Sequence, residues 1–344
     1  MPQLDGIRAL AVIVVLIHHA STPLDFPGWM GVDVFFVLSG YLITGILMRE
    51  IDDAGRIRMK RFYARRLIRL YPPLLLAVAV CAASALLVKG AVSVLANALL
   101  AVTYLMPIVT SFSLAGGDMW RHTWSLGIEE IFYLVWPALL LVLIRFTKSR
   151  RVQGVLAGAF GVVLTVGMLI ADLTADHSVY LLRSGGLFFG CALALVMHRS
   201  GRAFGRAWGY AGLALIVVAI VGSLWVTGYT FGVVLTIVGT VLLLMHVTTR
   251  ESEIVHALGS AAPAYVGRIS YELYIWHYPL LVIVATGMGG TLLDAAWIAM
   301  PLAIAAAVGS HALLTRPMDR WKARLPYERR ARRRAAPATE RAVR

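Results

Sequence analysis

Charged side chains are scarce in this sequence, and their scarcity excludes a soluble globular domain. Asp, Glu, Lys and Arg make up 15% of the 344 residues, whereas hydrophobic residues make up 59%. A soluble domain carries about a quarter charged residues and about half apolar ones. The mean hydropathy is +0.77, and the apolar runs are about 17–23 residues long, which is the length of a helix that crosses ~30 Å of hydrocarbon. We therefore expect an all-α, polytopic membrane helix bundle.

Cysteine is also rare. The sequence has two cysteines, Cys81 and Cys191, and each lies within an apolar run. They have no metal-ligand spacing, and two isolated cysteines form no disulfide framework. The sequence also lacks the G-x-S-x-G pattern of a hydrolase nucleophile. We expect no metal cofactor.

Acidic residues number 18 against 32 basic ones, a net charge of +14. The basic residues are concentrated in a few loops: eight in 49–70, four in 145–151, three in 198–209 and eleven in 315–344, but none in 23–31, 172–178 and 286–292. Loops rich in Lys and Arg face the cytoplasm. We therefore expect both termini to be cytoplasmic, and the lipid bilayer accounts for the charge without a nucleic-acid partner.

The sequence has eleven apolar segments, and they cannot all cross the membrane. They are residues 4–22, 32–48, 71–88, 92–109, 125–144, 152–171, 179–197, 210–227, 229–247, 263–285 and 293–314. Three of them separate the basic loops 49–70 and 145–151, and an odd number of crossings would put these loops on opposite sides. We expect 92–109, which carries Asn97 and ends near Pro107, to be a re-entrant or interfacial helix, which leaves about ten spanning helices. The alternative is that 92–109 spans and that 145–151 departs from a statistical rule.

The first apolar segment, "LDGIRALAVIVVLIHHA", carries ionisable residues at both ends. Such residues are candidate functional residues, because inserting one costs about 2.5–3.5 kcal/mol. Arg8 and His19 are eleven positions apart, which on a helix places them within ~20° of one face and ~16 Å apart along the axis. His18 points ~100° away from His19. The alternative for Arg8 is that it reaches back to the inner headgroups.

Three carboxylates are predicted to lie near the outer ends of their helices. Asp33 begins the second helix at the level of His19, where it is either a catalytic partner or an N-terminal dipole partner. Glu129 and Glu130, in "HTWSLGIEEIFYLVWP", lie about a turn inside a helix that starts at the outer face. Adjacent carboxylates diverge on a helix, so one of them could orient His19 while the other reaches water.

A cluster of basic residues lies at the predicted cytoplasmic surface in "RFYARRLIRLYPP". It comprises Arg61, Arg65, Arg66 and Arg69. Guanidinium groups on one helix face suit bidentate phosphate binding. The alternative is ordinary cytoplasmic anchoring of the helix.

A late stretch, "GRISYELYIWHYPL", places Glu272 and His277 among aromatic residues. Two interpretations of His277 stay open: it is either a core histidine with satisfied hydrogen bonds or a member of the site.

Five stretches carry a family resemblance when taken in order. They are "LDGIRALAVIVVLIHHA", "GVDVFFVLSGYLITGIL", "FYARRLIRLYPP", "HTWSLGIEEIFYLVWP" and "GRISYELYIWHYPL". Together they resemble the integral-membrane acyltransferases of family 3. The resemblance implies a ten-helix bundle that takes an acyl group, commonly acetyl, from cytoplasmic acyl-CoA. The acceptor is a hydroxyl of an extracytoplasmic or membrane-associated carbohydrate or glycolipid. It also implies a multi-pass protein of the bacterial plasma (inner) membrane.

The resemblance assigns roles to particular residues. The family's pattern of an arginine and a histidine separated by ten residues falls on Arg8 and His19, and its cytoplasmic arginine pair falls on Arg66 and Arg69. We therefore expect residues 1–314 to form a membrane acyltransferase domain, followed by a disordered basic cytoplasmic tail, 315–344. The predicted donor-binding residues are Arg8, Arg65, Arg66 and Arg69, and the predicted catalytic residues are His19, Asp33, Glu129 and Glu130.

Two questions stay open at the level of sequence. His19 is either a general base, with an ordinary pKa of ~6.5 near working pH, or the site of a covalent acyl intermediate. A transporter or flippase would use the same buried charges, although no inverted repeat or pair of broken helices is apparent. Acylation of a small secreted metabolite, such as a glycosylated antibiotic, is the other enzymatic alternative.

Overall fold

The structure is a computed structural model, and it describes residues 1–20, 26–86, 91–111, 119–174, 179–225 and 229–324. The regular secondary structure of these residues is helical, without strands. The α-helices are α1 (Pro2–Ala20), α2 (Met30–Ala54), α3 (Met59–Leu86), α4 (Ala91–Val102), α5 (Met106–Ser111), α6 (Trp124–Phe146), α7 (Arg150–Leu173), α8 (Val179–Leu182), α9 (Gly185–Met197), α10 (Arg206–Gly222), α11 (Tyr229–Val247), α12 (Glu253–Gly259), α13 (Ala261–Arg268), α14 (Ser270–Met288), α15 (Leu292–Ser310) and α16 (Arg316–Arg324). A 3₁₀ turn, Arg121–Thr123, precedes α6, and a π-turn, His311–Thr315, joins α15 to α16.

Eight helical stretches of the described chain are long and apolar enough to cross a membrane. They are α1, α2, α3, α6 with the turn before it, α7, Tyr180–Met197, α11, and the continuous stretch from α15 into α16. The prediction of an all-α membrane bundle is therefore confirmed. The other two predicted spans correspond to α10, which has 17 residues, and to α14, whose Glu272 and His277 lower its hydropathy. Their crossing stays a prediction.

The segment 92–109 forms no helix of spanning length. It is divided between α4, of 12 residues, and α5, of 6 residues. The helix breaks at Tyr104, whose φ of 57° lies in the left-handed region, and Pro107 follows in the first turn of α5. A 12-residue helix is ~18 Å long, well short of the hydrocarbon core. Gly127 of α6 lets this break pack closely, because a Cβ there would lie 2.5 Å from the Pro107 ring and 2.6 Å from the Tyr104 carbonyl oxygen.

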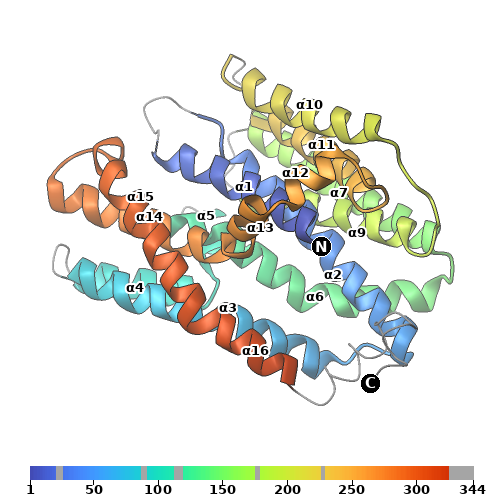
Figure 1. The fold of residues 1–344 in the computed structure, drawn as a ribbon, viewed down its shortest axis with the longest axis horizontal. Coiled ribbons are helices and arrows are strands. Elements are labelled where there is room, and N and C mark those ends of the chain that lie inside the picture. Colours follow the sequence, from blue (N-terminus) through green and yellow to red (C-terminus); the bar gives the residue numbers. More distant parts are fainter. Residues whose placement is uncertain (21–25, 87–90, 112–118, 175–178, 226–228, 325–344) are drawn as a thin grey trace.

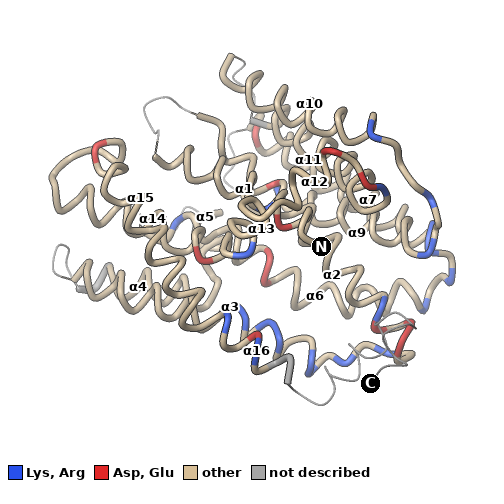
Figure 2. The backbone as a smooth tube through the Cα atoms, viewed as in Figure 1, with Lys and Arg blue, Asp and Glu red and all other residues tan. Residues whose placement is uncertain are grey.

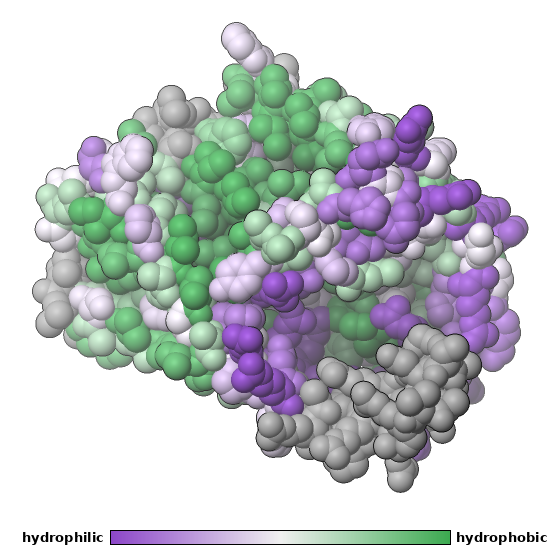
Figure 3. Space-filling model, viewed as in Figure 1, coloured by the Kyte–Doolittle hydropathy of each residue, from purple (hydrophilic) through white to green (hydrophobic). Residues whose placement is uncertain are grey.

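The first helix lies near the centre of the view, and α2, α12, α13 and α14 pack against it (Figure 1). Lys and Arg gather along the lower and right edges of the view, where α2 ends, α3 begins and α6 gives way to α7 (Figure 2). The right edge is hydrophilic in the space-filling view, whereas much of the left and upper surface is hydrophobic (Figure 3). The basic loops 49–70, 145–151 and 198–209 thus lie toward one side of the bundle.

The predicted tail begins as helix. Residues 311–315 continue α15 as the π-turn, and α16 extends to Arg324. Residues 325–344, the rest of the predicted disordered tail, lie outside the described residues. The π-turn matters for the site, because it directs two of its side chains toward α14, as described below.

Candidate active site

Three histidines cluster beside a cavity at the end of α1. His19 lies at the C-terminal end of α1, His122 in the 3₁₀ turn before α6, and His277 in the middle of α14. The centroid of the His19 ring lies 5.0 Å from that of His277 and 6.4 Å from that of His122. The ring of Tyr278 is 4.7 Å from that of His19. The cavity, which we call the histidine cavity, has a volume of about 280 Å³.

Hydrogen bonds fix His277 of α14 and His122 of the 3₁₀ turn before α6. His277 is fully buried, and its Nδ1 donates to the carbonyl oxygen of Leu273 at 3.0 Å, while its Nε2 lies 3.1 Å from His19 Nδ1. Nε2 of His122 donates to the carbonyl oxygen of Tyr274 at 3.1 Å, and the Tyr274 hydroxyl donates to the carbonyl oxygen of His122 at 2.7 Å. The turn before α6 is thus held against α14, and three elements distant in sequence meet at one site.

His18 also lines the histidine cavity, but it has a backbone partner. Its Nδ1 donates to the carbonyl oxygen of Phe26, and its Cβ lies 2.6 Å from the position that a Cβ on Gly28 would occupy. His18 therefore joins the end of α1 to the chain that leads into α2. Of the two adjacent histidines, His19 is the one in contact with the ring nitrogen of His277.

Asp33 forms a buried ion pair in the wall of the histidine cavity. Arg183 donates from Nε to Oδ1 at 3.0 Å and from a terminal nitrogen to Oδ2 at 2.7 Å. Both side chains are at most 1% exposed. The same guanidinium donates to the carbonyl oxygen of Trp29 at 2.8 Å and lies over the rings of Trp29 and Trp124. The structure therefore places Asp33 against an arginine that the sequence analysis did not single out.

Glu129 accepts two hydrogen bonds in a polar network between α2 and α6. Ser39 Oγ donates to Oε1 at 2.9 Å, and the hydroxyl of Tyr133 lies 2.8 Å from Oε2 and 2.9 Å from Ser39 Oγ. The guanidinium of Arg66 lies 3.4 Å from the centroid of the Tyr133 ring, and it also interacts electrostatically with Glu130. Both glutamates are thus placed toward Arg66. The group that contacts His19 Nδ1 is the ring nitrogen of His277.

A smaller space of about 40 Å³, the middle cavity, lies next to the histidine cavity. Arg8 and Glu129 both line it. Val32 and Tyr274 line the middle and the histidine cavities alike. Arg8 therefore lies along the same face of α1 as His19, as the eleven-residue spacing predicts, but in a separate compartment.

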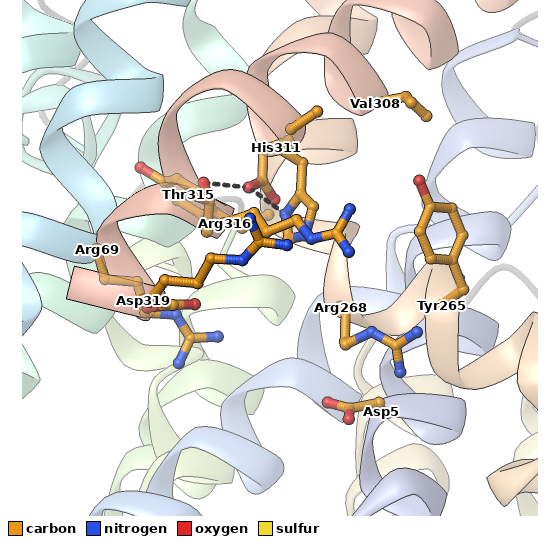
Figure 4. Close-up of a pocket in the computed structure, with 13 residues that line it drawn as sticks. Asp5, Arg69, Tyr265, Arg268, Val308, His311, Thr315, Arg316 and Asp319 are labelled. Atoms are coloured by element: carbon orange, nitrogen blue, oxygen red, sulfur yellow. Dashed lines mark hydrogen bonds and ion pairs between the residues drawn. The ribbon is translucent and has the colours of Figure 1, made fainter. Parts of the chain in front are cut away.

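A third cavity, which we call the arginine cavity, has a volume of about 670 Å³ and adjoins the middle cavity at Tyr271, which lines both. Its basic residues come from three helices (Figure 4); they are Arg69 of α3, Arg268 of α13, and Arg316 and Arg320 of α16. Its acidic residues are Asp5, Glu272 and Asp319. The cavity is thus lined by charge of both signs, with arginine in excess.

Glu272, which is 1% exposed, is held by the π-turn. Thr315 Oγ1 donates to its Oε1 at 2.6 Å, and His311 Nδ1 lies 3.0 Å from the same oxygen (Figure 4). A π-turn widens the helix by one residue per turn, and such turns are frequent at functional sites. Here the widened turn lets two side chains four positions apart reach one carboxylate oxygen.

Three of the four predicted donor-binding arginines, Arg8, Arg66 and Arg69, interact electrostatically, but their side chains have different surroundings. Arg69 lines the arginine cavity, Arg8 lines the middle cavity, and Arg66 lies on the Tyr133 ring. Arg65, half-buried on α3, is not among the described residues that line either cavity. Because Arg66 faces α6, the helical spacing of the cluster does not by itself show which arginines share a cavity.

Several residues of the site escaped the sequence analysis. Arg183 had a usable signal, since it is an ionisable residue inside the predicted span 179–197. His122 and Arg268 had a usable signal as well, since they lie in the stretches "HTWSLGIEEIFYLVWP" and "GRISYELYIWHYPL" that carry the family resemblance. Arg316 and Arg320 had none, because only the packing of α16 brings them to Arg69. In the described part of the chain, no group of three or more His, Cys, Asp or Glu is arranged to hold a metal ion.

Sequence comparison identifies the family to which these residues belong. Residues 1–316 match the family described as an acyltransferase domain, acyltransferase 3. The chain belongs to this acyltransferase family. The expected resemblance is confirmed, and the match includes every residue that lines the three cavities except Asp319 and Arg320. No solved structure matches the chain significantly.

Curated relatives of this acyltransferase come from bacteria. The O-acetyltransferase OatA of Staphylococcus aureus (strain NCTC 8325 / PS 47) is 30% identical over an alignment of 309 residues, which covers 83% of this chain and 51% of that protein. The peptidoglycan O-acetyltransferase OatA of Listeria monocytogenes serovar 1/2a is 28% identical over an alignment of 310 residues, which covers 82% of this chain and 50% of that protein. The chain thus spans about half the length of the curated relatives that it matches.

Proposed function

We propose that this acyltransferase moves an acyl group, commonly acetyl, from cytoplasmic acyl-CoA to a hydroxyl of a carbohydrate or glycolipid outside the bacterial plasma membrane. The observation that carries the proposal is the sequence of three adjoining cavities, from the arginine cavity through the middle cavity to the histidine cavity. A donor with a polyanionic head and a long thin arm fits such a path, because its head and its reacting group would occupy different compartments.

The arginine cavity suits the head of coenzyme A. Its volume of about 670 Å³ lies within the ~300–1,000 Å³ of ordinary ligand sites. Guanidinium groups bind phosphate oxygens in a bidentate manner, and the head carries several phosphates. We therefore assign the head to Arg69 together with Arg268, Arg316 and Arg320, and extend the predicted donor-binding set accordingly.

The middle cavity is narrow, with a volume of about 40 Å³, and would hold the pantetheine arm. Arg8 and Glu129 supply a cation and a carboxylate there, for the amide groups of the arm. Arg66 and Glu130 act indirectly, by holding Tyr133 and hence Glu129. Arg65 remains, in this proposal, a contact at the cytoplasmic mouth.

The histidine cavity would receive the thioester and the acceptor. His19 takes the proton of the acceptor hydroxyl as its oxygen attacks the thioester carbonyl carbon. The C–S bond then breaks, and the proton passes to the departing thiolate sulfur. Transfer through an acyl-histidine is the other order of events. Asp33 holds Arg183 in the wall, so its contribution is to positioning.

Aromatic side chains and the relatives' names support a carbohydrate acceptor. Trp29, Trp124, Tyr180 and Tyr278 line the histidine cavity, and flat apolar rings with polar edges suit a sugar, which has apolar faces and hydroxyl edges. The names of the relatives state O-acetyltransferase activity, in one case on peptidoglycan. We therefore favour a cell-envelope glycan over a small secreted metabolite.

The experiment is acyl transfer by the purified protein in lipid nanodiscs. Acetyl-CoA is supplied with soluble peptidoglycan fragments, thiol release is followed by a colorimetric reagent, and the fragments are analysed by mass spectrometry. We expect thiol release that depends on the fragments and the added acetyl mass on them. Release without fragment modification would refute the envelope acceptor, and no binding of acetyl-CoA would refute the donor site.

A further inference from the structure

The hydrogen bonds around His277 determine which nitrogen of His19 carries a proton. A carbonyl oxygen only accepts hydrogen bonds, so the contact between His277 Nδ1 and the Leu273 carbonyl oxygen, at 3.0 Å, places a hydrogen on Nδ1. A neutral imidazole carries a single N–H, so Nε2 of His277 is an acceptor. At 3.1 Å from this acceptor, His19 Nδ1 must then be the donor, which leaves His19 Nε2 with its lone pair.

Further contacts hold both rings in place. The backbone carbonyl of Val15, one turn earlier in α1, hydrogen-bonds the His19 ring. His277 is itself fixed in place, since it is 0% exposed and its ring contacts those of His122, Tyr274 and Tyr278. The acceptor nitrogen of His277 therefore cannot turn away from His19 without disturbing three other rings.

We propose that His277 is the positioning residue of the reaction: as a neutral acceptor it holds the His19 proton on Nδ1 and presents Nε2 as the base. This inference rests on the proposed function of His19. It assigns to an imidazole the task that a carboxylate performs in a Ser-His-Asp triad. A second imidazole performs that task in an apolar surrounding without a permanently buried charge, which would be costly.

His277 also stabilises the charged state of His19. When His19 accepts the hydroxyl proton it becomes an imidazolium, and its Nδ1–H bond to His277 becomes charge-assisted, which is roughly twice as strong as a neutral bond. The contact thus strengthens as the transition state forms, which is the condition for lowering a barrier. A residue that merely packed against His19 would affect both states equally.

The test compares two substitutions at one position. His277→Phe keeps a ring of similar size but removes the acceptor, and His277→Gln keeps an acceptor near the place of Nε2. We expect His277→Phe to lower kcat about 10- to 100-fold, with the Kd for acetyl-CoA unchanged, because only the difference between neutral and charge-assisted bonding is lost. His277→Gln should recover most of that loss. His256→Phe, on the exposed face of α12, is the matched control and should retain full activity.

The outcomes are decisive in both directions. Full activity of His277→Phe, or equal loss in Phe and Gln variants that bind acetyl-CoA normally, would overturn the proposal. Should a variant fail to fold, the ¹⁵N NMR spectrum of histidine-labelled wild-type protein decides instead. His19 should show the tautomer protonated on Nδ1, and protonation on Nε2 would overturn the proposal. A wild-type protein that transfers no acetyl group contradicts the proposed function but leaves this spectrum interpretable.

Discussion

The carboxylate of Asp33 holds Arg183 inside the bundle, and replacing it by an amide should destabilise the protein strongly. Both side chains are at most 1% exposed, and two hydrogen bonds join them. Asp33→Asn keeps the volume but leaves the guanidinium without its counter-charge. Breaking a buried pair in this way costs about 3–5 kcal/mol. The Trp29 carbonyl and the neighbouring indole rings offset only part of that cost, because neither carries a negative charge.

The assay is thermal unfolding in detergent micelles, followed by tryptophan fluorescence. Asp33→Asn should unfold at a clearly lower temperature than wild type, whereas the double variant Asp33→Leu with Arg183→Met, which removes both charges, should recover most of the loss. Asp52→Asn is the matched control. Asp52 pairs with His198 and Arg199 in a partly exposed setting, where such a pair contributes ~0–1 kcal/mol.

Activity separates the structural from the chemical role of Asp33. If the ion pair holds the cavity wall, acyl transfer should fall with the folded fraction and return in the charge-free double variant. An Asp33→Asn protein that unfolds like wild type yet transfers no acyl group would refute this reasoning. It would place the carboxylate among the reacting groups, as the sequence-based hypothesis of a catalytic Asp33 has it.

Three further expectations concern the base, the donor and the topology. His19→Ala should lose about 10²–10⁴-fold in acyl transfer while still binding acetyl-CoA, and His18→Ala should stay within a few-fold; the reverse order would exclude His19 as the base. Arg69→Ala should weaken acetyl-CoA binding by about ten- to a hundredfold, because a charge-assisted hydrogen bond contributes ~1.5–3 kcal/mol. Arg69→Lys should restore only part of the lost binding. An unchanged Kd would show that Arg69 serves membrane anchoring instead of donor binding. A single cysteine at Gly290 should react with an impermeant thiol reagent outside intact cells and one at Ser200 should not; equal labelling would contradict the predicted sidedness.

The helix bundle was predictable because the lipid bilayer requires it. Long apolar runs have one stable form in hydrocarbon. A parity argument about basic loops predicts that 92–109 does not span, and the structure divides this segment between two short helices. The break in that segment, however, is fixed by the left-handed Tyr104 and by the close packing of Gly127 against it. Such a contact depends on tertiary structure, so the division into two short helices was not apparent from the sequence.

The arrangement of the site was predictable only for pairs of residues that lie on the same helix. Arg8 and His19 share α1, so their spacing alone placed them on one face. Glu129 and Asp33 were expected near His19 because their helices start on the same side, yet their partners are Ser39 and Arg183. Depth along a helix is readable from sequence, but the direction of a side chain across the bundle depends on which helices are neighbours.

Helix α14 borders the whole path from the arginine cavity to the histidine cavity. Tyr271 and Glu272 of α14 line the arginine cavity, Tyr274 separates the middle and histidine cavities, and Tyr278 lines the last of these. A displacement of α14 on loading the donor would therefore also move the groups that receive the acceptor. The two substrates should then bind with a mutual coupling free energy, and reciprocity requires each to change the affinity of the other by the same factor. Isothermal titration of acetyl-CoA, with and without saturating glycan fragments, measures that factor directly.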